Sequence, residues 1–592
     1  MGKFLISNAE ELQKVRELPG GDYMLIADID LQGENWQPLD FCGTLEGNSH
    51  KISNFTVEGA ENCGFFGVNR GLVTGLELEN MTVCATGGKV GAIVAENYGD
   101  LSAVKVSYGK LTLKGAGCIG AVAGYNKGLL RNCFVAADLT VDTNETVYAG
   151  GLVGITEGGL LETLEHTGDI MLTGEKVCSG LFIGKGENTK LLALKFSAEM
   201  NLLNGQLYQN RACEEGQRLY FDGCIWRDNR NSDRLLDQEN LALRTKVERH
   251  MYKMGSHPWV PSRRLNYVCS CAGTVHNQEF LPGVTYYGVP YTHKHNSYEQ
   301  FLDCFDDKGD LKPWLKEEGW DGFDLHMGCD CSGGVYWAWS RVSPDIQFRW
   351  TGNMLPDEQE NGSLPLGGYE WVDGENTREI KQRNTPDKIA ECIAQMHKGD
   401  VFLRVVKSGH VRMCAGNPVI YRCPNGTVDF MASYVYTHEQ GDGLYPKNRH
   451  LHSSWLVNYR YNLATLINDD YIPVTNQVLL EGKMPQVQVA YSGENQVNVG
   501  KVSSNYRITK VTVEVSAEDV LWRKSLYTAN CSWGEQGNDR RPRDTIREFD
   551  LDEFNLYWGM CPVEKGKTYT YKVSVLLGTG DSYEVAAFDF TE

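Results

Sequence analysis

The chain has 592 residues, enough for several domains of ordinary size. Its 57 lysines and arginines against 77 aspartates and glutamates give a net charge of −20, which disfavours nucleic acid and anionic membrane surfaces as partners. Hydrophobic residues make up 41% of the chain, as in ordinary globular proteins, and no apolar run approaches the roughly 20 residues that span a bilayer. We therefore expect a multidomain protein that is not membrane-spanning.

The first residues, MGKFLISNAEEL, lack the basic and apolar segments of a secretory leader. Two interpretations stay open: a cytoplasmic protein, or a cell-surface or secreted protein whose leader has been removed. The 18 cysteines are scattered without paired CxxC spacing, which argues against a disulfide framework. The pairs Cys269/Cys271 and Cys329/Cys331 are spaced more closely than zinc ligands usually are, so we expect no metal and no cofactor.

Glycine-rich repeats fill the first third of the chain. The segments CGFFGVNRG, GAIVAENYG, GAVAGYNKG and GGLVGITEG align, and a degenerate fifth copy begins at Ser179. Their closing glycines recur at spacings of 28, 29 and 30 residues, at Gly71, Gly99, Gly128 and Gly158. Each unit contains short β-prone runs that a single unit cannot bury, whereas stacked units can. The repeats therefore predict a β-solenoid.

Two segments near the start, DIDLQGENWQPL and FCGTLEGNSHKISNFTVEG, precede these repeats. Together with the repeats they resemble the right-handed parallel β-helices built from GLUG repeats, over about residues 3–205. We therefore assign residues 1–205 to a domain of this kind. The resemblance implies a surface or carbohydrate-contacting spacer without catalytic residues, and a rigid scaffold without a glycan ligand stays equally open.

Beyond the repeats the periodicity is lost, and residues 206–484 are rich in Trp, Tyr, His and Pro. Apolar residues at helical spacing predict a helix over Asp237–Met254. Thr385 is a typical N-cap residue followed by proline, and it predicts a second helix that ends by Gly399.

From residue 485 to residue 592, apolar and polar residues alternate strictly, as in VTVEV and YTYKVSV. Such alternation over about a hundred residues predicts an Ig-like β-sandwich. This region carries no cluster of titratable residues typical of a catalytic site, so we expect it to bind or to act as a spacer.

The segment GCDCSGGVYWAW, residues 328–339, is the strongest chemical signal in the chain. Cys331 is followed by small residues and then by an apolar aromatic run that predicts a buried helix. A thiol at the start of a helix lies near unpaired N–H groups and the positive end of the helix dipole, which favour the thiolate. The same N–H groups suit an oxyanion. We therefore predict that Cys331 is a nucleophile.

A thiol nucleophile needs an imidazole partner, and a third group must orient that imidazole. GDVFLRVVKSGHVRM, residues 399–413, predicts two strands, the second of which begins near His410. The next strand-like run, SYVYTHEQ, ends in three candidates for the third group. We favour Glu439, and His438 and Gln440 stay open.

The motif DCSG at the nucleophile, GHV at the base and the upstream YYGVPY together resemble the papain-like cysteine peptidases of the NlpC and CHAP kind, over about residues 265–445. The resemblance implies an α+β papain-like domain within residues 206–484, with Cys331 as nucleophile and His410 as base. It also implies that Asp330 and Tyr291 bind the free amine of a peptide stem, and we place Ser332 beside them in the substrate site.

The sequence therefore predicts a mainly β protein whose central domain is a cysteine peptidase or amidase. The family resemblance points to peptide stems or crosslinks of the bacterial cell wall as substrates. One alternative is a surface adhesin or glycan-binding scaffold with an inactive peptidase-like domain, and another is transfer of the acyl group to an acceptor other than water. We expect His293 and His295 to line the substrate cleft or a solvated loop, and the insertion over residues 341–384 to shape the cleft.

Overall fold

The computed structural model describes residues 3–207, 211–271, 274–293, 295–312, 327–344, 346, 348–356, 363–441, 452–527 and 547–592. The chain divides into two compact units, residues 1–232 with 419–433, and residues 233–418 with 434–592. Strands dominate both units, so the prediction of a mainly β fold is confirmed. No helix among these residues is long and apolar enough to cross a bilayer.

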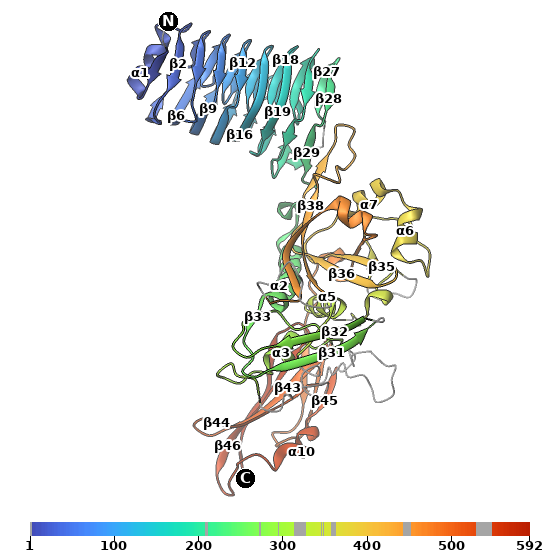
Figure 1. Cartoon of the computed structure of the whole chain (residues 1–592). Helices are drawn as coiled ribbons and strands as arrows, with labels where there is room; N and C mark the ends of the chain where they lie inside the picture. Colours follow the sequence, from blue (N-terminus) through green and yellow to red (C-terminus); the bar gives the residue numbers. More distant parts are fainter. Residues whose placement is uncertain are drawn as a thin grey trace. The chain divides into compact units, whose positions relative to one another are not determined.

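The first unit is a parallel β-solenoid, drawn in blue to teal in Figure 1, and this prediction is confirmed. One face stacks β4 (Leu39–Phe41), β7 (Phe66–Asn69), β11 (Val94–Asn97), β15 (Ala123–Asn126), β18 (Val153–Glu157), β22 (Ile183–Glu187) and β27 (Cys213–Gln217). A second face stacks β10 (Gly88–Gly91), β14 (Gly117–Gly120), β17 (Val147–Gly150) and β21 (Val177–Gly180). The third includes β6 (Lys51–Gly59), β9 (Glu77–Ala85), β13 (Lys105–Leu113), β16 (Leu129–Asp142) and β19 (Leu160–His166).

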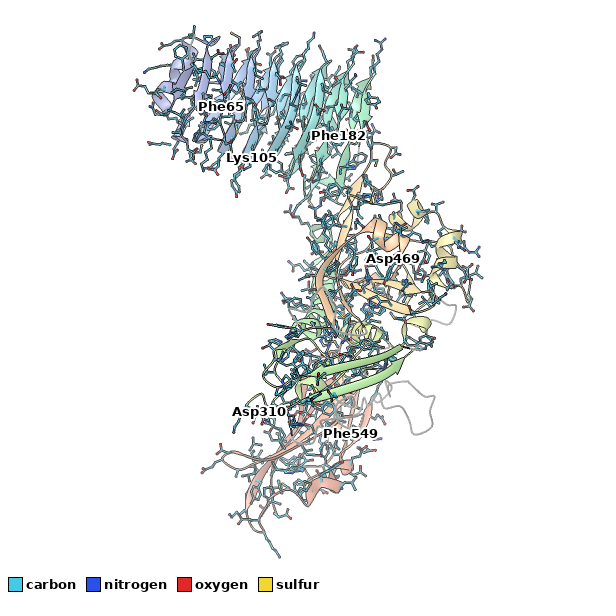
Figure 2. All side chains as sticks on the ribbon, viewed as in Figure 1. Phe65, Lys105, Phe182, Asp310, Asp469 and Phe549 are labelled. Carbon is cyan, nitrogen blue, oxygen red and sulfur yellow. The ribbon has the colours of Figure 1, made fainter. Side chains whose placement is uncertain are left out.

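The sequence repeat produces the stack in two ways. Apolar residues point inward and form one continuous core, in which Phe65 and Phe182 are fully buried (Figure 2). The closing glycines let neighbouring coils approach, since a Cβ on Gly99 would lie 2.2 Å from the carbonyl oxygen of Gly71. Each coil therefore needs glycine at the same corner, which explains the period seen in the sequence.

The solenoid continues beyond the predicted boundary at residue 205. Strand β28 (Tyr220–Asp222) pairs in parallel with β23 (Lys190–Leu192), and β29 (Ile225–Asp228) pairs with β24 (Lys195–Phe196). Strand β37 (Ile420–Arg422) then pairs antiparallel with β29. The boundary at 205 and the continuous central span 206–484 are therefore both wrong, because the last coils lack the glycine repeat and one strand comes from far along the chain.

The second unit contains a six-stranded antiparallel sheet. Its strand order is β34 (Leu364–Pro365), β40 (Ile472–Thr475), β35 (Val401–Val405), β36 (Gly409–Cys414), β38 (Tyr434–Gln440) and β39 (Trp455–Asn462). Helix α5 (Cys331–Trp339) is buried along its whole length and contacts β36 and β38. Helix α2 (Gln238–Ser256) packs against α5, and α7 (Pro386–Ile393) packs against β40. Thr385 caps α7, as predicted, although α7 ends well before Gly399. Asp237, the start of the other predicted helix, is the N-cap of α2.

The C-terminal part of the second unit has two sheets around one core. A three-stranded sheet holds β41 (Val489–Ser492), β42 (Lys501–Ser504) and β45 (Glu548–Asp550). A four-stranded sheet holds β44 (Val520–Tyr527), β43 (Ile508–Ser516), β46 (Thr568–Leu577) and β47 (Ser582–Thr591). Alternate residues of β43 and β46 share the buried core with Phe549 (Figure 2), as the alternating pattern predicts.

Candidate active site

Cys331 is the first residue of α5, and Asp330 is the N-cap of that helix. Oδ1 of Asp330 accepts hydrogen bonds from the Gly333 backbone N–H at 2.7 Å and from the Ser332 hydroxyl at 2.8 Å. Nε2 of His295 lies 2.9 Å from Oδ2 of the same carboxylate. Burial raises the pKa of Asp330, but the hydrogen bonds and the charge of His295 outweigh burial and lower it. Asp330 therefore stays ionised and fixes the start of the nucleophile helix.

The Cys331 side chain is enclosed, with 8% of the residue exposed. Its sulfur accepts hydrogen bonds from the backbone N–H groups of Val411 and Ser332, which lower the thiol pKa. Burial raises that pKa more strongly, and the negative charge of Asp330 adds to the rise. The resting thiol is therefore protonated, and a neighbouring base must remove its proton before it attacks a carbonyl.

His410 lies on β36, one residue before the Val411 amide that meets the thiol. Its Nε2 atom lies 2.6 Å from Oε2 of Glu439, which is 1% exposed on the neighbouring strand β38. Burial raises the pKa of Glu439, but the hydrogen bond and charge of His410 and the charge of Arg412 lower it overall. An ionised carboxylate only accepts hydrogen bonds, so Nε2 is the protonated nitrogen and Nδ1 is left as the acceptor for the thiol proton.

Two further side chains hold the Glu439 carboxylate. The Tyr461 hydroxyl donates a hydrogen bond to Oε1 at 2.5 Å. Nε of Arg412 lies 3.1 Å from Oε2, and this contact is an ion pair without the alignment of a hydrogen bond. The Arg412 guanidinium lies between two aromatic rings, 4.1 Å from the centre of Tyr461 and 4.3 Å from that of Tyr471. Such stacking stabilises a buried guanidinium. Neither Arg412 nor Tyr461 carries a sequence motif of its own, and the two residues reach Glu439 because β36 and β39 are the neighbours of β38 in the sheet.

The three candidates for the third group occupy different environments. Nε2 of His438 lies 2.9 Å from Oε1 of Glu248, and its Nδ1 accepts the Asn458 backbone N–H. The Gln440 amide donates to the Val289 carbonyl oxygen at 2.8 Å. Glu439 is therefore the one of the three that contacts His410.

The other predicted site residues, Tyr291 and Ser332, lie on either side of the nucleophile in the sequence. Tyr291 is mostly buried and its backbone forms an isolated parallel bridge with Cys329, two residues before Cys331. Its hydroxyl lies 3.2 Å from Nε2 of His293. Ser332 is buried and hydrogen-bonded to Asp330, as described above. The side chains of Cys269 and Cys271 lie outside the described part of the chain.

The insertion after α5 borders both halves of the site. Arg349 lines a small cavity that runs along α5 from Ser332 to Trp339. Thr351, in the short 3-10 helix η3 (Thr351–Asn353), packs on Gly409 so closely that a Cβ there would lie 1.8 Å from its hydroxyl oxygen. The same short segment therefore contacts the nucleophile helix and the strand of the base.

Comparison with known proteins returned no relative. No family model matches the chain, and neither a curated protein nor a solved structure is similar to it. The assignment of the site therefore depends on the geometry of its own residues.

Proposed function

We propose that the protein is a thiol hydrolase of amide or peptide bonds, with a papain-like domain in its second unit. The observation that carries the proposal is the placement of a buried, ionised Glu439 on Nε2 of His410, beside the Cys331 thiol at the start of a helix. A thiol, an imidazole base and an orienting carboxylate are the groups that a thiol hydrolase requires.

In the proposed reaction, Nδ1 of His410 takes the thiol proton while the Cys331 sulfur forms a bond to the substrate carbonyl carbon. Backbone N–H groups at the start of α5 stabilise the oxyanion. His410 then protonates the leaving nitrogen, the C–N bond breaks, and an acyl enzyme remains. Water, deprotonated by His410, attacks the acyl carbon and releases the carboxylic acid and the free thiol.

The proposed substrates are peptide stems or crosslinks of the bacterial cell wall, and this part depends on the resemblance to NlpC and CHAP peptidases. The same resemblance assigns Asp330 and Tyr291 to a substrate amine. Three protein groups already bind the Asp330 carboxylate, so an ammonium group would join this network as an additional donor. The solenoid, as a GLUG-type β-helix that contacts glycans, and an Ig-like sandwich would then hold the enzyme near its substrate.

The direct test is turnover of purified muropeptides and crosslinked cell wall by the full chain. Cys331→Ala is the inactive variant, and Cys329→Ala is its matched control, because Cys329 is also buried but lies outside the helix start. We expect the wild type and Cys329→Ala to release new amines, which are identified by mass. Cys331→Ala should release none. Absence of product from the wild type, together with an unreactive Cys331, would favour the scaffold with an inactive domain.

A further inference from the structure

Two arginines beside the candidate nucleophile have no counter-ion among the described residues. Arg404 lies on β35 directly opposite His410, so both side chains leave the same face of the sheet. It is half-buried, and its Nε atom is inaccessible to solvent and makes no hydrogen bond. Burial raises the pKa of Tyr471 and the charge of Arg404 opposes that rise, so Arg404 lies near a tyrosine whose ring centre is 6.5 Å from that of His410.

Arg349 shows the same features beside Ser332, the residue that follows the nucleophile. It is half-buried, it lines the cavity shared with Ser332, and its Nε atom is also inaccessible and without a hydrogen bond. Across the described chain, neither Arg349 nor Arg404 takes part in an ion pair.

This environment differs from that of other arginines in the structure. Five arginines are buried among the described residues: Arg244, Arg341, Arg412 and Arg422 each lie against a carboxylate, whereas Arg507 donates to the Ile346 carbonyl oxygen and lies over the Tyr336 ring. Removing a guanidinium from water without a partner is costly, and a chain with a net charge of −20 has many carboxylates with which to compensate it. Two uncompensated cations, one opposite His410 and one beside Ser332, therefore suit a site where the anion belongs to the substrate.

The acidic groups near the thiol do not cancel these charges. Asp330 is bound by His295, and Glu439 is bound by His410 and Arg412. Their charges are already engaged within the protein, so Arg349 and Arg404 leave a local excess of positive charge at the site.

We propose that Arg349 and Arg404 form a carboxylate-binding subsite, so that the enzyme prefers acyl substrates with a carboxylate close to the scissile carbonyl, as in acidic peptides. The planar guanidinium matches a carboxylate through two parallel hydrogen bonds. This inference depends on the proposed function, because it requires Cys331 to be the nucleophile, and it adds the charge class of the substrate.

The test compares two alkylating probes that differ in charge, iodoacetate and iodoacetamide, on the full-length protein. In both reactions the Cys331 thiolate forms a bond to the methylene carbon and iodide leaves. Peptide mapping measures the rate at Cys331 alone. We expect the ratio of the iodoacetate rate to the iodoacetamide rate to fall at least about 5-fold when both Arg349→Gln and Arg404→Gln are introduced.

Two controls keep the result specific to the charge. Arg460→Gln removes an arginine of the same sheet whose guanidinium lies over the Tyr434 ring, and it should leave the ratio unchanged. The pair Arg349→Lys and Arg404→Lys keeps both charges and should retain most of the preference. Added salt should lower the wild-type ratio, a measurement that does not depend on the folding of any variant.

The outcomes separate the two proposals. One outcome overturns the carboxylate subsite and leaves the proposed hydrolase intact. In that outcome Cys331 reacts with both probes, but the ratio of the iodoacetate rate to the iodoacetamide rate is the same in the wild type and the glutamine variant and does not depend on salt. If neither probe alkylates Cys331, the proposed function is overturned and the subsite with it.

Discussion

Nε2 of His410 and Oε2 of Glu439 are 2.6 Å apart, on the neighbouring strands β36 and β38. Because Glu439 is buried and ionised, this contact places the proton of the neutral imidazole on Nε2 and leaves Nδ1 able to accept one. The sheet, rather than a loop, therefore sets both the orientation and the tautomer of the proposed base.

Glu439→Gln tests this role. The glutamine fits the same space, but its amide N–H can donate to Nε2 and thereby place the imidazole proton on Nδ1, where it blocks proton transfer from the thiol. We expect turnover of the muropeptide substrate to fall by about 10²- to 10⁴-fold, as when an orienting carboxylate is replaced in a catalytic triad. His438→Gln is the control, since His438 contacts Glu248 instead, and equal losses in both variants would contradict the assignment.

Arg412→Gln is expected to move the acid limb of the pH–rate profile. Arg412 lowers the pKa of Glu439, so removing its charge raises that pKa and lets the carboxylate protonate at higher pH. Activity should then be lost at a higher pH than in the wild type as the pH falls. Arg412→Lys keeps the charge and should retain the wild-type profile more closely, and an identical acid limb in all three proteins would rule out this role for Arg412.

Asp330→Asn separates two roles of the residue before the nucleophile. Asparagine can still accept the Gly333 N–H as an N-cap, but it removes a negative charge that raises the pKa of Cys331. We therefore expect faster alkylation of Cys331 by neutral iodoacetamide near neutral pH. If Asp330 also binds a substrate amine, the variant should lose turnover of stems with a free amine more than of the same stems with the amine acetylated.

Residues within a local motif can be proposed from the sequence alone. Cys331 and His410 follow from DCSG and GHV, and the repeat period predicts the solenoid, because both signals lie within short stretches of chain. Long-range partners left no such signal. Arg412 and Tyr461 meet Glu439 only through the pairing of β36, β38 and β39, and Arg404 meets His410 only across a hairpin.

The end of the solenoid was missed for the same reason. Strand β37 joins β29 from about 190 residues further along the chain, and an ion pair between Arg422 and Asp228 accompanies this pairing. No periodicity relates these two segments.

Asn97→Leu is expected to destabilise the middle of the solenoid. Buried asparagines form a ladder in which the Asn69 amide donates to Asn97 at 2.9 Å, and the Asn97 amide donates to Asn126 at 2.8 Å. Leucine removes both bonds and leaves polar partners unsatisfied, at a cost of about 2–4 kcal/mol. Hydrogen exchange of β7, β11 and β15 should accelerate, while Asn144→Leu, at an exposed asparagine, should change exchange little. Unchanged protection in Asn97→Leu would show that the ladder contributes no stability.

His166 is expected to make the solenoid sensitive to mild acid. Burial lowers its pKa from 6.5 to about 4, despite the hydrogen bond between Nε2 and the Ala137 carbonyl oxygen. Between these two values the unfolded chain binds a proton that the folded chain does not, so stability falls as the pH drops from about 6.5 to about 4, by about 3 kcal/mol.

The measurement is urea unfolding at several pH values, followed by a brief hydrogen-exchange pulse at one fixed pH and mass analysis of peptides from β19. The unfolding midpoint of these peptides should fall with pH in this window in the wild type. His166→Phe, which can pack against Phe196 as His166 does, removes the titrating group and should flatten the dependence. A slope that persists unchanged in His166→Phe would assign the acid sensitivity to groups other than His166, because no other change has been made to the buried core of β19.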